Sequence, residues 1–431
     1  MSAFSRLIPL CALFGAVSLS PVAVGALGVL PYAPAGVALV AFAARAFGRP
    51  RRRLSKRVST VLLSVCFGVT LSDLAARPLF HYLSSIRPAE RYIHRWPPLP
   101  RLLRYAAGVN YAGLTYGDLA AVSGRRDWRE WHRIRFVTDE HGFRNEPPPT
   151  GSAARPLDLI VLGDSFGVAA ATTQEETLSG VLARDYGLAV YNLSVSREGP
   201  RQQYANLLLE GPRLNTHEGT CVLWLIFTGN DLDDPYDPEL ENPKPARPGV
   251  WARLATGVGD FRARSPVRRL LSGNDSRSVI ERKFIDGRRV LFSQYYAQRR
   301  WRTADDVMRH PNFGPLKTTL GAMQRLAGER RLRVSVALVP SKEEVYSWVL
   351  DGAPAWSAHE EPSGFSDVLR RLSEQHGFRF LDLKPALLED ARRENERSGA
   401  LLWWRDDTHW NGAGQRSAAR AVYQNLLAHP D

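Results

Sequence analysis

The chain begins with a long apolar stretch that contains no charged side chain from residue 7 to residue 44. One helix needs about 20 residues to cross the hydrocarbon core of a bilayer, so this stretch is long enough for two helices. Prolines interrupt it near residues 31–34, and another apolar run follows over residues 58–76. The pattern predicts a membrane region with about three transmembrane helices within residues 1–87.

Basic residues lie between the predicted spans. Residues 1–60 hold eight Lys or Arg and no acidic residue, and most of these bases lie in residues 49–57. Because basic loops are retained on the cytoplasmic side, this cluster predicts that the chain after the third span lies outside the cytoplasm. We therefore expect a protein of the inner or plasma membrane with a large extracytoplasmic, or periplasmic, domain. A cleaved signal peptide in residues 1–26 is the alternative.

Residues 88–150 differ in pattern from the regions on both sides. They contain proline-rich runs near residues 97–100 and 147–149, with a strand-like segment over residues 136–145. We expect a stiff juxtamembrane connector whose polar residues are structural.

Short apolar runs alternate with helical stretches from residue 151 to residue 431. This alternation predicts strands at 157–162, 189–193, 221–227, 332–339 and 379–383, and helices at 177–186, 200–209, 315–330, 364–376 and 412–427. Apolar strands that alternate with helices are typical of a parallel sheet that is covered on both faces. The predicted fold class is a three-layer α/β domain.

Candidate chemistry follows the predicted strands, where ligands bind in such sheets. Ser165 follows the first strand within Gly-Asp-Ser, and His409 precedes the last helix. A serine hydroxyl becomes a strong nucleophile when a histidine takes its proton, provided that a carboxylate orients the imidazole. Asp406 and Asp407 are both candidates for this carboxylate. The pattern predicts acyl transfer.

Acyl transfer also requires hydrogen-bond donors for the oxyanion of the tetrahedral intermediate. The predicted donors are the backbone N–H groups of Ser165 and Gly199 and the side-chain amide of Asn230, which follow the first three strands. A glycine at position 199 allows close approach of the backbone.

These segments resemble the SGNH, or GDSL-type, hydrolase superfamily over about residues 155–428. The resemblance assigns the four named residues to Ser165, Gly199, Asn230 and His409. It implies a flavodoxin-like α/β/α domain that hydrolyses or transfers ester-linked acyl groups without a metal or another cofactor. Asp407-Thr-His409-Trp-Asn is similar to the last motif of alginate O-acetylation proteins, whereas the more general Asp-x-x-His pattern selects Asp406.

Residues 339–346 also resemble that subgroup, and Lys342 within them is either a substrate-binding residue or a solvated loop residue. An insertion over about residues 235–315 is strongly basic, with 14 Lys or Arg and six Asp or Glu in residues 253–309. We expect a helical lid, which is either solvated or in contact with an anionic glycan or lipid headgroups.

Charge and cysteine content exclude other classes of protein. The net charge is +13, but the first 60 residues contribute eight of these charges, and an exported domain does not meet nucleic acid. Three cysteines in apolar surroundings do not form a disulfide scaffold.

We therefore expect a membrane-anchored serine esterase that acts on O-acyl groups, in particular O-acetyl groups, of a cell-envelope carbohydrate. The alternatives are an O-acetyltransferase for an exported polysaccharide, with a possible membrane acyl-donor partner, and a non-catalytic glycan-binding module. The substrate is an acylated carbohydrate or another ester.

Overall fold

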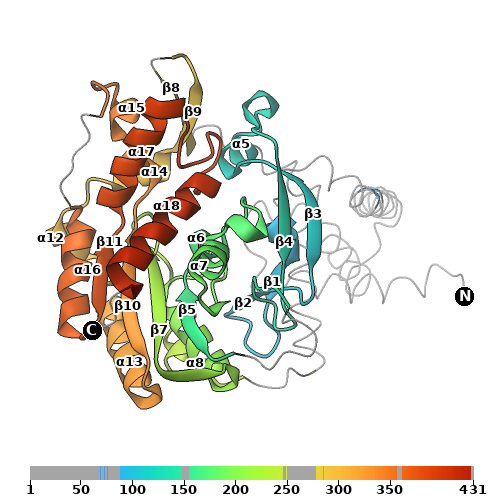
Figure 1. The fold of residues 1–431 in the computed structure, drawn as a ribbon, viewed down its shortest axis with the longest axis vertical. Coiled ribbons are helices and arrows are strands. Elements are labelled where there is room, and N and C mark those ends of the chain that lie inside the picture. The colour runs from blue at the N-terminus through green and yellow to red at the C-terminus, as the bar shows by residue number, and fades with distance from the viewer. Residues whose placement is uncertain are drawn as a thin grey trace, which may run out of the picture. The chain divides into compact units, whose positions relative to one another are not determined.

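The computed structural model describes residues 88–147, 155–245, 278–284, 286–356 and 362–428, together with a few isolated positions. Its centre is a five-stranded sheet in the order β11-β10-β7-β5-β6 (Figure 1). All neighbouring strands in this sheet are parallel. The strands are β5 (Leu157–Leu162), β6 (Val190–Asn192), β7 (Thr216–Phe227), β10 (Arg333–Val339) and β11 (Arg379–Asp382).

Each of these strands coincides with a predicted one, which confirms the predicted α/β class with a parallel sheet. The longest difference is at β7, which begins at Thr216 rather than at residue 221. The added residues are polar and carry no apolar signal, but Thr216 pairs with Leu157 of β5.

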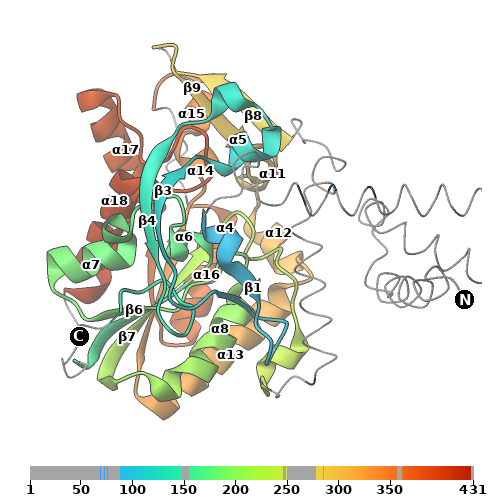
Figure 2. The same ribbon diagram turned by 90° about the vertical axis from the view of Figure 1, so that its right-hand side faces the viewer.

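Helices cover both faces of the sheet. Alternate strand residues such as Ile160 and Trp224 pack with α8, α13 and α16, whereas Leu159 and Leu223 pack with α7, α17 and α18. Figure 2 shows α7, α17 and α18 on one side and α8 and α13 on the other. The helices are α6 (Ser165–Val168), α7 (Leu178–Tyr186), α8 (Pro200–Glu210), α13 (Phe313–Arg330), α14 (Lys342–Val345), α15 (Ser347–Asp351), α16 (Gly364–Gln375), α17 (Lys384–Ser398) and α18 (Gly412–Val422), and a π-helical segment, η8 (Tyr423–Leu427), follows α18.

Residues 88–147 are not a simple connector, which differs from the expectation for residues 88–150. They form α4 (Pro88–Tyr92), β1 (Ile93–Arg95), β2 (Leu103–Tyr105), β3 (Asn110–Thr115), α5 (Asp118–Ser123) and β4 (His132–Val137). The strands pair as two antiparallel ribbons, β1 with β2 and β3 with β4. Tyr105, Phe136 and Phe143 are buried in the same apolar core as β5 and β7. This segment therefore belongs to the same compact unit as the sheet.

The described part of the predicted insertion packs against the sheet domain. It contains β8 (Val279–Lys283), β9 (Arg289–Ser293), α11 (Gln294–Arg299) and α12 (Ala304–Arg309). The ribbon of β8 and β9 is antiparallel, and Val290 and Phe292 are buried in the core on the α18 side.

The predicted transmembrane spans fall within residues 7–76, outside the described ranges. Within the described ranges, no helix combines the length and the apolar character that a bilayer crossing requires.

Candidate active site

Ser165 lies at the carboxyl end of β5, as the first residue of α6. The Asp164 carboxylate caps this helix by accepting a hydrogen bond of 2.8 Å from the Phe166 N–H. The turn is tightly packed, because a Cβ on Gly167 would lie 2.1 Å from the Ser194 hydroxyl. This packing fixes the backbone that presents the Ser165 hydroxyl.

The Ser165 hydroxyl meets His409, which lies in the loop before α18. Ser165 Oγ is 2.7 Å from His409 Nε2, and His409 Nδ1 is 2.7 Å from Asp407 Oδ1. A carboxylate only accepts hydrogen bonds, so Nδ1 carries the proton and Nε2 accepts the hydrogen bond from the Ser165 hydroxyl. The predicted serine and histidine, 244 positions apart, are thus brought into contact.

The structure places Asp407, and not Asp406, against the imidazole. Asp407 is fully buried, and its Oδ1 also accepts a hydrogen bond from the His409 N–H at 2.9 Å. Asp406 points to residues 88–147 instead, where its Oδ2 accepts hydrogen bonds from the Gly117 N–H at 2.9 Å and the Glu130 N–H at 2.8 Å. Burial raises the pKa of Asp406 to about 7. Of the two candidates, Asp407 therefore has the geometry of the orienting acid, and Asp406 anchors the loop.

Further contacts from residues 88–147 fix the loop that carries His409. The Arg405 N–H donates a hydrogen bond of 2.9 Å to Glu130 Oε2. The His132 ring stacks on the Trp404 ring at a centroid distance of 3.7 Å. After the loop, the Asn411 side chain caps α18 by accepting hydrogen bonds from the N–H groups of that helix. The loop is thus held at both ends.

Lys342, predicted to be either a substrate-binding residue or a solvated loop residue, lies buried against the loop that carries His409. Its side chain is fully buried, and Nζ donates hydrogen bonds to the backbone carbonyls of Asp407 at 2.5 Å and Trp404 at 3.2 Å. Burial lowers the pKa of Lys342. The ammonium group therefore holds the backbone of the loop that carries His409, here called the histidine loop, rather than binding substrate or lying in a solvated loop.

Gly199 and Asn230, the remaining predicted oxyanion residues, share one neighbour. A Cβ on Gly199 would lie 2.7 Å from Asp234 Cβ, so only glycine fits beside this side chain. The Asn230 amide donates long hydrogen bonds to the Asp234 carboxylate, at 3.3 and 3.4 Å. The segments after β6 and β7 therefore meet at Asp234.

Asp234 also links these segments electrostatically to the turn of Ser165. Burial, followed by the negative charge of Asp164, raises the pKa of Asp234 to about 7. Burial likewise raises the pKa of Asp231, with added repulsion from Asp164 and Asp234. Three carboxyl groups thus lie close together beside the predicted oxyanion residues, and their mutual repulsion disfavours full ionisation.

Arg144, in residues 88–147, contacts the C-terminal end of α6, the nucleophile helix that begins at Ser165. Its guanidinium is buried and donates hydrogen bonds to the carbonyls of Val168 at 2.7 Å, Ala169 at 2.6 Å and Thr172 at 2.7 Å. Desolvation lowers the pKa of Arg144 to about 9. This agrees with the expectation that the polar residues of segment 136–145 are structural.

Sequence reasoning missed Asp118, Glu130 and Arg144 as neighbours of the site. Thr408 N–H, for example, donates a hydrogen bond of 2.8 Å to Asp118 Oδ1, across 290 positions of the chain. No local pattern signals such a distant contact. Next to Asp118 the sequence has a glycine, Gly117. The structure explains this glycine, because a Cβ there would lie 1.9 Å from the Asp406 carbonyl oxygen.

Asp118, Asp407 and His409 offer possible metal ligands whose atoms lie within 4.8 Å of one another. However, the protonated Nδ1 of His409 already donates to Asp407, and a metal would compete with this hydrogen bond. We therefore interpret the cluster as an acid–base arrangement.

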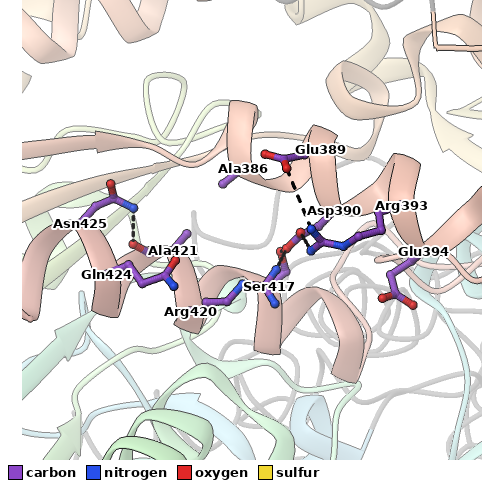
Figure 3. A pocket seen from close by; sticks show the side chains of 10 residues that line it. All are labelled: Ala386, Glu389, Asp390, Arg393, Glu394, Ser417, Arg420, Ala421, Gln424 and Asn425. Atoms are coloured by element: carbon purple, nitrogen blue, oxygen red, sulfur yellow. Dashed lines mark hydrogen bonds and ion pairs between the residues drawn. The ribbon is translucent and has the colours of Figure 1, made fainter.

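A surface groove of about 530 Å³ lies between α17 and α18 (Figure 3). Its carboxylate Asp390 already interacts with Arg393, Ser417 and Arg420. None of the predicted site residues lines the groove, so it is distinct from the candidate active site.

Comparisons with known proteins agree with the predicted resemblance. Residues 302–431 match the family of the SGNH hydrolase-like domain of the acetyltransferase AlgX. The matched residues include Lys342, Asp407 and His409, whereas Ser165 lies outside them. No curated protein matches the sequence.

Several solved structures share limited similarity with the chain. The acetyl xylan esterase AlAXEase is 13% identical with a TM-score of 0.34, and the match covers 62% of this chain and 98% of that protein. The psychrotrophic esterase EstA from Pseudoalteromonas sp. is 14% identical with a TM-score of 0.32, and the match covers 63% of this chain and 96% of that protein. Phospholipase A1 from Streptomyces albidoflavus NA297 is 11% identical with a TM-score of 0.31, and the match covers 63% of this chain and 100% of that protein. Similarity at this level supports no statement about substrate.

The family match and the motifs lead to the same assignment. Residues 302–431 are similar to the SGNH hydrolase-like domain of the acetyltransferase AlgX, and the contacts among Ser165, His409 and Asp407 are those of a serine hydrolase or acyltransferase.

Proposed function

We propose that the protein removes or transfers O-acyl groups, in particular O-acetyl groups, on a cell-envelope carbohydrate through an acyl-enzyme on Ser165. The observation that carries this proposal is the continuous hydrogen-bond chain from Ser165 through His409 to Asp407, with both links at 2.7 Å. Such a chain activates a serine hydroxyl toward an ester carbonyl.

The proposed reaction has two half-steps. Ser165 Oγ attacks the ester carbonyl carbon while His409 Nε2 takes the hydroxyl proton, and the N–H groups of Ser165 and Gly199 with the Asn230 amide stabilise the oxyanion. The bond to the sugar oxygen then breaks, and His409 returns the proton to that oxygen. Water or a second sugar hydroxyl then attacks the acyl carbon while His409 Nε2 takes its proton. The bond between the acyl carbon and Ser165 Oγ breaks, and His409 returns the proton to Oγ.

Transfer to a second sugar is the alternative to hydrolysis. The match of residues 302–431 to the domain of an acetyltransferase favours it. Both reactions use the same acyl-enzyme, and they differ in whether the site excludes water and binds a second sugar.

The test incubates the full-length protein with an acetylated sugar, with and without an acceptor glycan. Free acetate with no modified acceptor supports the esterase, whereas acetylated acceptor supports the transferase. A Ser165→Ala variant that releases or transfers acetate as fast as the wild type would refute both.

We also propose that residues 1–87 anchor the protein in the inner or plasma membrane, with the SGNH domain on the extracytoplasmic side and within reach of a membrane acyl donor. The apolar runs and the basic loop of residues 49–57 support this arrangement. Protease added to spheroplasts should digest the SGNH domain. Protection in intact spheroplasts, with digestion after lysis, would contradict it.

A further inference from the structure

Asp118 reaches the histidine loop from outside the sheet. It is the first residue of α5, and the N–H groups of Leu119 and Ala120 donate hydrogen bonds to the Asp406 carbonyl oxygen at 3.1 and 3.2 Å. Together with the Gly117 contact described above, these bonds dock the start of α5 on the residue that precedes Asp407. The position of the Asp118 side chain relative to His409 is thereby fixed.

The Asp118 carboxylate holds Thr408, the residue between Asp407 and His409. Its Oδ1 accepts a hydrogen bond of 2.8 Å from the Thr408 N–H, and its Oδ2 accepts one of 2.5 Å from the Thr408 hydroxyl. One carboxylate thus makes hydrogen bonds to both the backbone and the side chain of Thr408. It restricts both the backbone and the side chain of the Asp-Thr-His turn.

The same carboxylate lies at the edge of the imidazole. Asp118 Oδ2 is 3.6 Å from His409 Nδ1, compared with 2.7 Å for Asp407 Oδ1. Thr408 Oγ1 contacts both the Asp118 carboxylate and the imidazole, and it lies 3.0 Å from His409 Nδ1. The imidazole is therefore flanked by two carboxylates rather than one.

Other charged groups surround this arrangement. Asp164 lies on the Ser165 side of the imidazole, and its charge interacts with that of His409. The Lys342 ammonium interacts electrostatically with both Asp407 and Asp118. Asp118 is the member of this set that comes from residues 88–147, and its side chain is a quarter exposed.

We propose that Asp118 is a positioning residue for the reaction of Ser165. It holds Thr408 so that His409 Nε2 points to the Ser165 hydroxyl, and its charge stabilises the imidazolium that forms when His409 takes the proton. This proposal rests on the proposed function for its kinetic consequence, and not for its effect on His409 itself.

The kinetic test compares Asp118→Asn with the wild type and with Asp127→Asn. Asp127 belongs to the same segment but is half exposed and pairs with Arg125, so it is a matched control. We expect Asp118→Asn to lower kcat roughly 10-fold with little change in KM. The acid limb of the rate profile should move to lower pH by roughly 0.5 to 1 unit, because the imidazole loses a neighbouring negative charge.

A second measurement needs no substrate. Nitrogen-15 NMR of histidine-labelled full-length protein follows the ionisation of His409, with His409→Gln used for assignment. We expect the midpoint to move to lower pH in Asp118→Asn and to stay unchanged in Asp127→Asn. If Asp118→Asn does not fold, Thr408→Val removes the hydroxyl link from the other side, and Thr408→Ser restores it.

The outcomes separate this inference from the proposed function. An unchanged His409 midpoint together with unchanged kcat in folded Asp118→Asn, or a Thr408→Val protein that behaves like Thr408→Ser, would overturn the role of Asp118. A shifted midpoint in a protein whose wild type shows no Ser165-dependent turnover would instead refute the proposed function and still support the role of Asp118 in positioning His409.

Discussion

The parallel sheet and residues 88–147 contribute to the candidate site in different ways. Segments at the carboxyl ends of the strands carry the predicted nucleophile, Ser165 after β5, and the predicted oxyanion donor, Asn230 after β7. Residues 88–147 supply supports instead, with Arg144 on the nucleophile helix and Glu130 on the histidine loop. The difference teaches that strand ends decide which chemistry is possible, whereas the added segment fixes the geometry in which it occurs.

The largest expected effect separates the two adjacent aspartates of the histidine loop. Asp407→Asn should lower kcat about 1,000-fold or more, because an amide can favour the wrong tautomer of His409. Asp406→Asn, on the side of residues 88–147, should retain most of the activity, since an amide oxygen can still accept hydrogen bonds from Gly117 and Glu130. Initial rates of ester hydrolysis measure both, and equal losses would contradict the assignment of Asp407.

A second prediction concerns Asn230, the predicted oxyanion donor on the sheet side. Asn230→Ala should lower kcat about 100-fold or more, because one donor to the oxyanion is lost. Asn425→Ala is a control, because the Asn425 amide in η8 donates a hydrogen bond to the Ala421 carbonyl in α18. Circular dichroism should show native helix content in both variants. A fully active Asn230→Ala enzyme would exclude this residue from the oxyanion hole.

Arg144 tests the supporting side. Arg144→Met leaves the buried carbonyls of Val168, Ala169 and Thr172 without their donor, so the free energy of unfolding should fall by roughly 3 kcal/mol. Arg155→Met, at an exposed ion pair with Asp158, should change it by less than about 1 kcal/mol. Chemical denaturation measures both values. Similar stabilities in the two variants would show that residues 88–147 are not needed to hold the nucleophile helix.

The smallest predicted effect concerns pH and stability at Asp234. The folded protein keeps the proton of this carboxyl to about pH 7, whereas an ordinary aspartate releases it near 3.8. The folded state thus binds more protons between these values, and the free energy of unfolding falls as pH rises through this range. Asp234→Asn should abolish this loss, so the variant should be more stable than the wild type at pH 8 but not at pH 4. A constant difference between the two proteins from pH 4 to pH 8 would contradict this.

The sheet side was largely predictable from sequence because its signals are local. Continuous apolar runs marked the strands, and the residues after them marked Ser165 and Asn230. α17 was missed because charged residues dominate it and its buried stripe is narrow, with Leu387 and Ala391 among its few buried apolar residues. The pattern also left open the choice between Asp406 and Asp407, because adjacent residues share the same sequence context.

Residues 88–147 were not predictable in the same way. Their strands are short, and their prolines resemble those of a linker, although Phe136 and Phe143 are fully buried. Their contacts with the site, such as those of Asp118 with Thr408, depend on packing between segments that are remote in sequence. Lys342 was misjudged for a related reason, since a lysine that donates to buried carbonyls has the same sequence signature as one on the surface.

The central claim is that Ser165 is the nucleophile and that His409 activates it. The most direct measurement is peptide mass mapping of the full-length protein after reaction with a fluorophosphonate, for the wild type, Ser165→Ala and His409→Gln. We predict one adduct on Ser165 in the wild type, none at that position in Ser165→Ala, and labelling at least about 100-fold slower in His409→Gln. An adduct on another residue, or equally fast labelling of all three proteins, would contradict the claim.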